Sequence, residues 1–285
     1  MNEKLEKKYQ TQPDQSELGQ SSNYDSHYNP ERLFAIPRAP KRQEIGIDPK
    51  HLPFYGFDCW NHYEVSWLNE KGKPCVGVAE IIYDCATPYL VESKSLKLYF
   101  NSFNNTKFKN SEAIRQTITH DVAERLKGDV QVRIRSLEEK ELSLIQSAPA
   151  GECIDTLDVA CSVYLVEPDY LSIEKDRMEE ILYSNLLKSN CLVTNQPDWG
   201  SVQIAYTGPK INREGLLKYL VSFRNHNEFH EQCIERIFVD IMNRCKPEKL
   251  TVYGRYTRRG GLDINPYRST EKVEPKGLNH RLIRQ

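Results

Sequence analysis

Residues 99–105 read Tyr-Phe-Asn-Ser-Phe-Asn-Asn, and residues 219–225, which begin 120 positions later, read Tyr-Leu-Val-Ser-Phe-Arg-Asn. Upstream, the Ile-Ile-Tyr of residues 81–83 matches the Ile-Ala-Tyr of residues 204–206 at an offset of 123. Apolar positions continue the match at the offset of 120, as Ile114 with Ile234 and Ile118 with Phe238. Self-similarity at one spacing indicates an internal repeat.

Each copy of the repeat predicts the same order of elements: two strands, a helical segment, then one or more strands. Apolar residues at four-residue spacing predict the helices, and alternation predicts the strands. The predicted first strands are 80–83 and 203–206, the second strands 96–100 and 216–221, and the last strands 130–134 and 250–252. The first predicted helix carries Ile114, Ile118, Val122 and Leu126 between a Ser111 cap and a stop at Gly128, and the second carries Ile234, Phe238 and Met242. Strands grouped around a helical block favour an α+β fold with an antiparallel sheet.

The polar composition of the first thirty residues sets them apart from the repeat. We expect residues 1–30 to form a flexible N-terminal arm. The first module is predicted over residues 31–170 and the second over residues 171–285. Residues 138–150 are expected to connect them.

Composition excludes several classes of protein. The chain has 285 residues, with 39 Lys and Arg against 40 Asp and Glu, so its formal net charge is −1. The overall composition excludes a collagen, a coiled coil and a wholly disordered chain. The net charge argues against direct binding of nucleic acid. No apolar run suits a membrane span, and the first ten residues lack a signal peptide's apolar stretch. We therefore expect a cytoplasmic protein. The eight cysteines form no C-x-x-C pair, and without an export signal we expect no disulfide framework.

The two copies differ most at their beginnings, and these differences point to function. The second copy opens with Cys-Leu-Val-Thr-Asn-Gln-Pro-Asp over residues 191–198, and the first copy has no equivalent. The Asn-Gln-Pro-Asp segment is typical of a turn, which could fold Asp198 back towards the sulfur of Cys191. A thiol beside a carboxyl group suits a nucleophile with an acid or base partner. On spacing alone, a structural cysteine is the favoured interpretation over a nucleophile.

Charged residues mark three other segments. The first copy carries Glu92, Ser93, Lys94 and Lys97 in a pattern typical of a half-exposed strand. His230 and Glu231 begin the second predicted helix, where Glu231 could simply favour the helix dipole. The sequence His-Glu-Gln-Cys-Ile at residues 230–234 resembles H-E-x-x-H, but Ile234 replaces the second histidine and excludes a zinc protease. No other cluster has the ligand spacing of a metal site, so we expect no metal.

A basic, glycine-containing segment follows the last predicted strand. Residues 258–261 read Arg-Arg-Gly-Gly, and residues 251–285 carry eight Lys or Arg against three Asp or Glu, a net charge of +5. Paired arginines suit phosphate groups and adjacent glycines permit a close approach of the backbone, although a basic surface loop would look the same. The sequence contains neither a G-x-G-x-x-G nor a G-x-x-x-x-G-K-[ST] motif, so a nucleotide would bind without a Rossmann or P-loop element.

Two motifs together resemble a known family. The Glu-Ser-Lys-Ser-Leu-Lys-Leu-Tyr of residues 92–99 is similar to the signature of the NADPH-dependent 7-cyano-7-deazaguanine reductases, the nitrile reductases of queuosine biosynthesis. Residues 191–198 resemble that family's nucleophile element, C-x-x-T-x-Q-P-D. The resemblance runs from about Pro30 to the C-terminus and is to the long, two-module form. It implies two tandem tunnelling-fold modules, each an antiparallel sheet backed by helices, and a homodimer.

The resemblance also implies roles for individual residues. Cys191 would attack the nitrile to form a covalent thioimide, and Asp198 would protonate the nitrogen. Two NADPH per turnover would then give the primary amine, without a metal. The substrate-binding candidates are Val91, Glu92, Ser93, His230 and Glu231. The cofactor-binding candidates are Ser93, Lys94, Arg259 and Gly260, with Arg258 as an additional candidate.

Two other functions remain to be distinguished. A non-catalytic module that binds a purine or pterin on the same scaffold would bind the base without a covalent adduct. An RNA-binding protein is suggested only by the basic tail, and the net charge of −1 argues against it.

Overall fold

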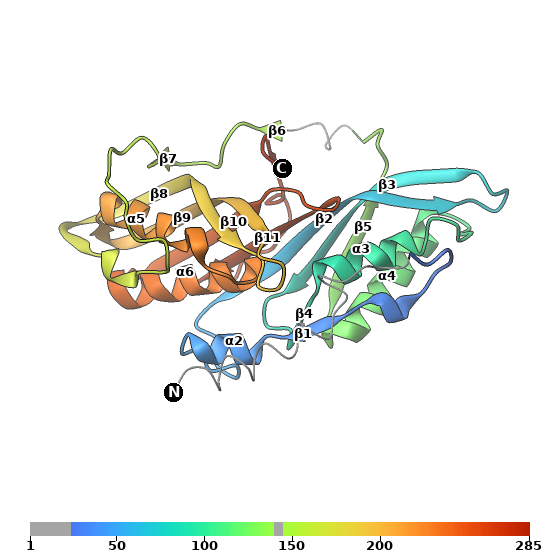
Figure 1. Ribbon diagram of the computed structural model, residues 1–285, viewed down its shortest axis with the longest axis horizontal. Helices are drawn as coiled ribbons and strands as arrows, with labels where there is room; N and C mark the ends of the chain where they lie inside the picture. The colour runs from blue at the N-terminus through green and yellow to red at the C-terminus, as the bar shows by residue number, and fades with distance from the viewer. Residues whose placement is uncertain (1–23, 140–144) are drawn as a thin grey trace.

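The computed structural model describes residues 24–139 and 145–285 (Figure 1). The repeated core elements of the first half are β2 (Tyr55–Leu68), β3 (Pro74–Asp84), α3 (Ser93–Asn101), α4 (Ser111–Leu126) and β5 (Val130–Arg135). Those of the second half are β8 (Ile173–Asn190), β9 (Pro197–Ile211), α5 (Arg213–Ser222), α6 (His230–Cys245), β10 (Lys249–Tyr256) and β11 (Leu262–Ser269). The shorter elements are η2 (Pro30–Arg32), β1 (Ala35–Pro37), α2 (Ala39–Glu44), β4 (Tyr89–Val91), β6 (Ile145–Gln146), β7 (Glu152–Cys153), η4 (Pro168–Tyr170), η5 (Phe223–Asn225) and β12 (Arg281–Leu282).

One sheet of eight strands runs through both halves, in the order β5-β3-β2-β11-β10-β9-β8-β7. Its neighbours are antiparallel, apart from the short parallel contact of β7 with β8. The halves join where β11 pairs with β2 over eight residue pairs, from Leu262 with His62 to Ser269 with Tyr55. The predicted α+β class with an antiparallel sheet is therefore confirmed, and the two sheet-and-helix modules lie edge to edge.

The helices α3, α4, α5 and α6 pack against one face of this sheet (Figure 1). In the second half, Ile234 and Phe238 of α6 are fully buried against β10 and β11. In the first half, Ile114 and Ile118 of α4 are equally buried. The opposite face of the sheet carries a smaller cluster that includes Phe57 and Tyr267.

The repeat is visible in matching side-chain contacts. The Tyr99 hydroxyl donates to Asp121 at 2.5 Å, and the Tyr219 hydroxyl donates to Asp240 at 2.6 Å. Each bond ties the shorter helix of its module to the longer one. The longer helices, α4 and α6, both end at a lysine in the left-handed conformation, which closes the last turn.

Two predicted strands are wrong, because residues 96–100 lie in α3 and residues 216–221 in α5. Each half therefore has two strands, two helices and then strands. A short apolar run fits either period, and here the spacing of Leu96, Tyr99 and Phe100 on one buried side of α3 is helical. The Asn212 side chain caps α5 by accepting from the Gly215 amide.

The cap predicted for α4 is also displaced. Asn110, and not Ser111, accepts the Ala113 amide, and the left-handed residue at the far end is Lys127 with φ 56°, one position before Gly128.

Of the predicted N-terminal arm, residues 1–23 lie outside the described part of the chain. Tyr28 stacks on Phe103 with ring centroids 5.4 Å apart, so the end of that segment packs on the first module. The module boundary at residue 170 stays a prediction.

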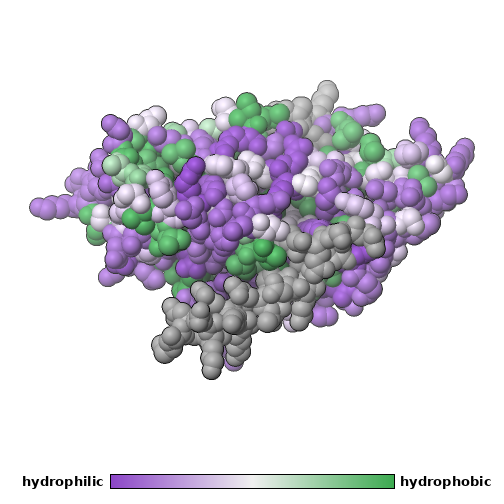
Figure 2. Space-filling model, in the orientation of Figure 1, coloured by the Kyte–Doolittle hydropathy of each residue, from purple (hydrophilic) through white to green (hydrophobic). Residues whose placement is uncertain are grey.

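The surface seen in Figure 2 is mainly hydrophilic, with small separate hydrophobic patches. Over residues 24–139 and 145–285, no helix is both long and apolar enough to cross a bilayer.

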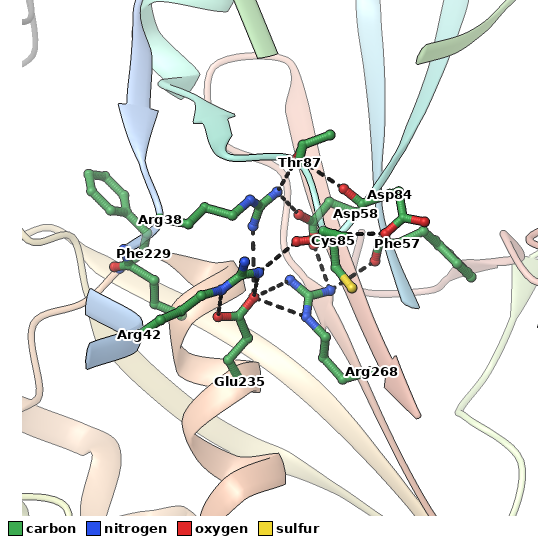
Figure 3. A network of polar contacts seen from close by, with 12 residues as sticks. Arg38, Arg42, Phe57, Asp58, Asp84, Cys85, Thr87, Phe229, Glu235 and Arg268 are labelled. Atoms are coloured by element: carbon green, nitrogen blue, oxygen red, sulfur yellow. Dashed lines mark hydrogen bonds and ion pairs between the residues drawn. The ribbon is translucent and has the colours of Figure 1, made fainter. Parts of the chain in front are cut away.

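A buried cluster of five charged side chains joins the halves near the β2–β11 seam (Figure 3). Glu235 of α6 contacts Arg42 at 2.7 Å and Arg268 at 2.9 Å. Asp58 of β2 contacts Arg38 at 2.5 Å and Arg268 at 2.8 Å. All five side chains are at most 3% exposed. Burial alone would raise the pKa of Asp58 and Glu235, but the arginines outweigh it and hold both below their usual values.

This cluster predicts a large difference between a buried and an exposed glutamate. Glu235→Ala leaves buried Arg42 without its acidic partner and leaves Arg268 with Asp58 alone, so it should lower the free energy of unfolding by about 3–5 kcal/mol. Glu112→Ala removes an exposed ion pair with Arg115 and should lower the free energy of unfolding far less, because solvent screens this pair. Urea unfolding of the two variants measures the difference, and similar losses would contradict this account.

Candidate active site

The β8–β9 hairpin brings Cys191 and Asp198 to one end of the sheet. Ser189 pairs with Asp198 across the hairpin, and the Cys191 amide donates to the Gln196 carbonyl at 2.8 Å, which extends the ladder. Cys191 therefore lies on the same face of the hairpin as Asp198, diagonally across from it. The loop turns through Asn195, whose φ is 59°. The predicted turn is present, and Cys191 is buried at 2% exposure.

Asp198 is an ionised carboxylate held between the side chains of Arg259 and His230. Its Oδ1 lies 2.7 Å from Arg259 Nη1 and 3.5 Å from His230 Nε2. Burial raises the pKa of Asp198, but His230, Arg259 and Lys188 together lower it below its usual value. An ionised Asp198 can accept a proton before it donates one.

Glu231 is the opposite case, a buried acid with too few partners. It lies in the first turn of α6 at 1% exposure, and its Oε1 has no hydrogen-bond partner among the described residues. Burial, followed by repulsion from Asp58, raises the pKa of Glu231 to about 7, although His230 and Arg38 oppose the shift. Its free oxygen is available to a donor that the protein does not supply.

Glu92 caps a helix and does not stand on a strand, which corrects the prediction for residues 92–97. Its two carboxylate oxygens accept the Lys94 amide at 2.8 Å and the Ser95 amide at 2.7 Å. Burial raises the pKa of Glu92, although these two amides, Lys94 and Arg259 oppose the shift. A carboxylate accepts about four hydrogen bonds, so Glu92 retains capacity for a ligand.

The turn after β10 brings the second module close to α3, the helix that carries most of the motif at residues 92–99. Gly260 and Gly261 have φ of 62° and 79°, in the left-handed region that glycine favours. A Cβ at Gly260 would lie 3.2 Å from the Lys97 side chain of α3. Arg259 is one-third exposed here. Glu64 packs against Gly261 and pairs with Lys97 at 3.3 Å. The cations Arg259 and Lys97 beside this turn fit a phosphate-bearing cofactor such as NADPH.

The remaining candidates lie beside this turn or near it. Val91 ends β4 and is buried, while Ser93 and Lys94 form the first turn of α3 and are half-buried. Arg258 points elsewhere, because its guanidinium stacks 3.8 Å from the Tyr63 ring centroid and donates to the Gln285 carbonyl. Within the described ranges, no group of three or more His, Cys, Asp or Glu side chains could hold a metal.

A single chain thus brings the two motif sets together. The Arg259 charge acts on both Asp198 of the second module and Glu92 of the first. A groove of about 1150 Å³ lies elsewhere, between Asn61, Arg133 and Lys276, and none of the predicted site residues line it.

Sequence reasoning missed several neighbours of the site. Tyr256 packs edge-on against His230, with ring centroids 4.1 Å apart, and Lys188 lowers the pKa of Asp198. Asp58 and Tyr83 of the first module interact electrostatically with Glu231. The only sequence signal for Tyr83 was its place in the repeat, and tertiary packing alone reveals the others.

Family comparisons agree with this arrangement. A family described as "Nitrile reductase, 7-cyano-7-deazaguanine-reductase N-term" matches residues 24–134, and a "QueF-like protein" family matches residues 197–275. A curated protein of Legionella pneumophila (strain Lens), named NADPH-dependent 7-cyano-7-deazaguanine reductase, is 66% identical over the full length of both chains. The chain belongs to the 7-cyano-7-deazaguanine reductase family.

Other relatives extend this family assignment. A 7-cyano-7-deazaguanine reductase of Cupriavidus metallidurans is 55% identical over 96% of this chain and all of its own. One of Delftia acidovorans is 53% identical over 90% of this chain and 94% of its own. Among solved structures, an archaeosine synthase QueF-Like in the apo form has 16% identity and a TM-score of 0.29, and covers 37% of this chain and 97% of its own.

Because the pKa of Glu231 is raised, replacing it with a residue that cannot ionise should stabilise the folded chain, and more so at high pH than at low pH. The folded pKa of about 7 exceeds the usual 4.5, so the stability that Glu231 contributes is full below pH 4.5 and is lost as the pH rises through 7. Glu231→Gln cannot ionise and should gain on the order of 2 kcal/mol at pH 8, and less at pH 5. The exposed Glu138→Gln is the control, with no pH-dependent gain. Urea unfolding at both pH values measures this, and equal gains at pH 5 and pH 8 would count against a buried, raised-pKa acid.

Proposed function

We propose that this chain reduces the nitrile of 7-cyano-7-deazaguanine to the aminomethyl group with NADPH, in queuosine biosynthesis, through a covalent adduct on Cys191. Its relatives carry the name of that NADPH-dependent reductase, and the chain is accordingly an oxidoreductase. The observation that carries the proposal is the placement of Cys191 diagonally across from an ionised Asp198, whose partner His230 adjoins Glu231 in α6.

The covalent step begins with proton transfer from Cys191. Asp198 accepts the thiol proton, and the resulting thiolate adds to the nitrile carbon. A C–S bond forms, one π bond of the nitrile breaks, and the electron pair goes to nitrogen. Asp198 returns the same proton to that nitrogen, which gives a neutral thioimide. The low pKa of Asp198 supports this order, because the carboxylate starts without a proton.

The reductive steps convert the thioimide into a primary amine. Two hydrides and two protons are required in total, and the C–S bond breaks after the first reduction, so that Cys191 leaves as a thiol and the carbon becomes an imine. NADPH, when bound, supplies one hydride for each reduction, and we propose two per turnover without a metal. Ser93, Lys94, Arg259 and Gly260 would hold it. The buried position of Cys191 limits access of water, which would hydrolyse the imine.

Recognition of the base would rest on the buried acids. A deazaguanine presents a ring N–H and an exocyclic amine side by side, and an ionised carboxylate accepts both. Glu231 is suited to this role by its unpartnered Oε1, and Glu92 by its remaining capacity. His230 lies between Asp198 and Glu231, while Val91 and Ser93 flank Glu92 and would line the site.

We also propose a cytoplasmic homodimer. The eight cysteines are free thiols, which suits a reducing compartment. The strand β8 is 18 residues long, but β7 covers only two of its residues on the outer side. Ile173, Ile181 and Leu186 of β8 are each more than 40% exposed. A long edge that is largely uncovered and carries exposed apolar side chains favours pairing with another chain, and a second copy is the proposed partner.

The proposed function predicts a fixed stoichiometry. Purified protein with limiting 7-cyano-7-deazaguanine should oxidise two NADPH per nitrile, followed by the loss of absorbance at 340 nm. Cys191→Ala should abolish this oxidation and still bind the base, because the groups proposed to bind it are unchanged. Cys75→Ala, at the start of β3, is the matched control and should retain full turnover. Turnover by Cys191→Ala would contradict the covalent mechanism, and no NADPH oxidation by the unsubstituted protein would contradict the function.

A further inference from the structure

Tyr83 and Tyr206 occupy equivalent positions in the repeat but differ in their hydroxyl groups. The Tyr206 hydroxyl donates to Glu180 and accepts the Ile211 amide at 2.9 Å. The Tyr83 hydroxyl has no hydrogen-bond partner among the described residues, although the tyrosine is only 2% exposed. Buried hydroxyls are almost always bonded, so this difference between the copies indicates a role outside the fold.

The surroundings of Tyr83 place its hydroxyl beside the proposed substrate site. Tyr83 pairs with Asp58 across β2 and β3, and the Arg38 guanidinium lies 5.8 Å from its ring centroid. The Val91 amide lies near the hydroxyl, outside hydrogen-bonding geometry. Glu231, whose Oε1 also lacks a partner, is close enough to interact electrostatically with Tyr83. Two unpartnered polar atoms, one from each module, therefore lie in one buried region.

We propose that Tyr83 is a further substrate-binding residue, whose hydroxyl donates a hydrogen bond to the ring carbonyl of the deazaguanine while Glu231 accepts the neighbouring N–H. The inference rests on the proposed function. In a 6-oxo, 2-amino base the carbonyl stands next to the ring N–H. The carbonyl would accept from the Tyr83 hydroxyl, and the ring N–H would donate to the Glu231 carboxylate.

The chemistry of both groups suits these assignments. Burial, followed by the charges of Glu231 and Asp58, raises the pKa of Tyr83 well above its usual value, so the hydroxyl keeps its proton and is a donor. A 6-amino base would present a donor to this hydroxyl and no ring N–H to Glu231. Because a hydroxyl can also accept, the selection of 6-oxo over 6-amino bases would rest mainly on Glu231, with Tyr83 as the donor to the carbonyl.

Paired variants test the inference. Tyr83→Phe should raise KM for the nitrile, and the Kd for 7-deazaguanine measured by calorimetry without NADPH, by about three- to tenfold, as expected for one lost hydrogen bond. Its kcat should change less. Its Tm should be equal or higher, because a buried hydroxyl without a partner is removed. Tyr206→Phe, the matched control, should lower Tm and leave KM and Kd unchanged.

The outcomes separate this inference from the proposed function. If the unsubstituted protein binds and reduces the nitrile but Tyr83→Phe has an unaltered KM and Kd, Tyr83 does not contact the base. A Tm loss in Tyr83→Phe as large as in Tyr206→Phe would assign the hydroxyl a structural role and overturn the inference. If the unsubstituted protein neither binds 7-deazaguanine nor oxidises NADPH with the nitrile, the proposed function fails, and the inference fails with it.

Discussion

The ion pairs of Glu235 with Arg42 and of Arg268 with Asp58 hold α6 and β11 against the first module, and the rest of the site depends on that contact. Glu231 lies one helical turn before Glu235 on the same helix, so the cluster fixes the position of the acid that we propose to bind the substrate. The cost of burying five charges is offset only because each acid meets two or more arginines. The β2–β11 pairing adds the backbone connection at the same seam.

Similar burial gives Asp198 and Glu231 opposite protonation behaviour. Asp198 meets His230 and Arg259, which keep its pKa low, whereas Glu231 faces Asp58 and stays near pKa 7. Environment thus separates the two carboxyl groups in the way that their proposed roles require, Asp198 as a proton carrier and Glu231 as a group that accepts hydrogen bonds from the base. The proposal therefore predicts that substrate binding and the chemical step can be disrupted separately.

The sequence predicted the architecture better than its local details. The repeat and the apolar spacing predicted both long helices, the β3 and β9 segments and the α+β class, because these features rest on periodic burial. Residues 96–100 were assigned wrongly to a strand, since a short apolar run satisfies either period until tertiary contacts choose. The hairpin turn before Asp198 followed from turn chemistry. The neighbours of Glu231 could not be foreseen, because Arg38 and Asp58 are distant in sequence and meet this acid only in the folded chain. Lys188 is close to Asp198 in sequence, but only the register of the β8–β9 hairpin reveals their proximity.

The central claim is that the Cys191 sulfur forms a bond to the substrate in a site completed by both modules. Intact-mass analysis of the full chain with 7-cyano-7-deazaguanine, in the absence of NADPH, tests it most directly. The account predicts one added nitrile mass per chain, located on the peptide that contains Cys191 and absent from Cys191→Ala. Tight binding of the nitrile with an unchanged protein mass would contradict it and would favour a module that binds the base without chemistry.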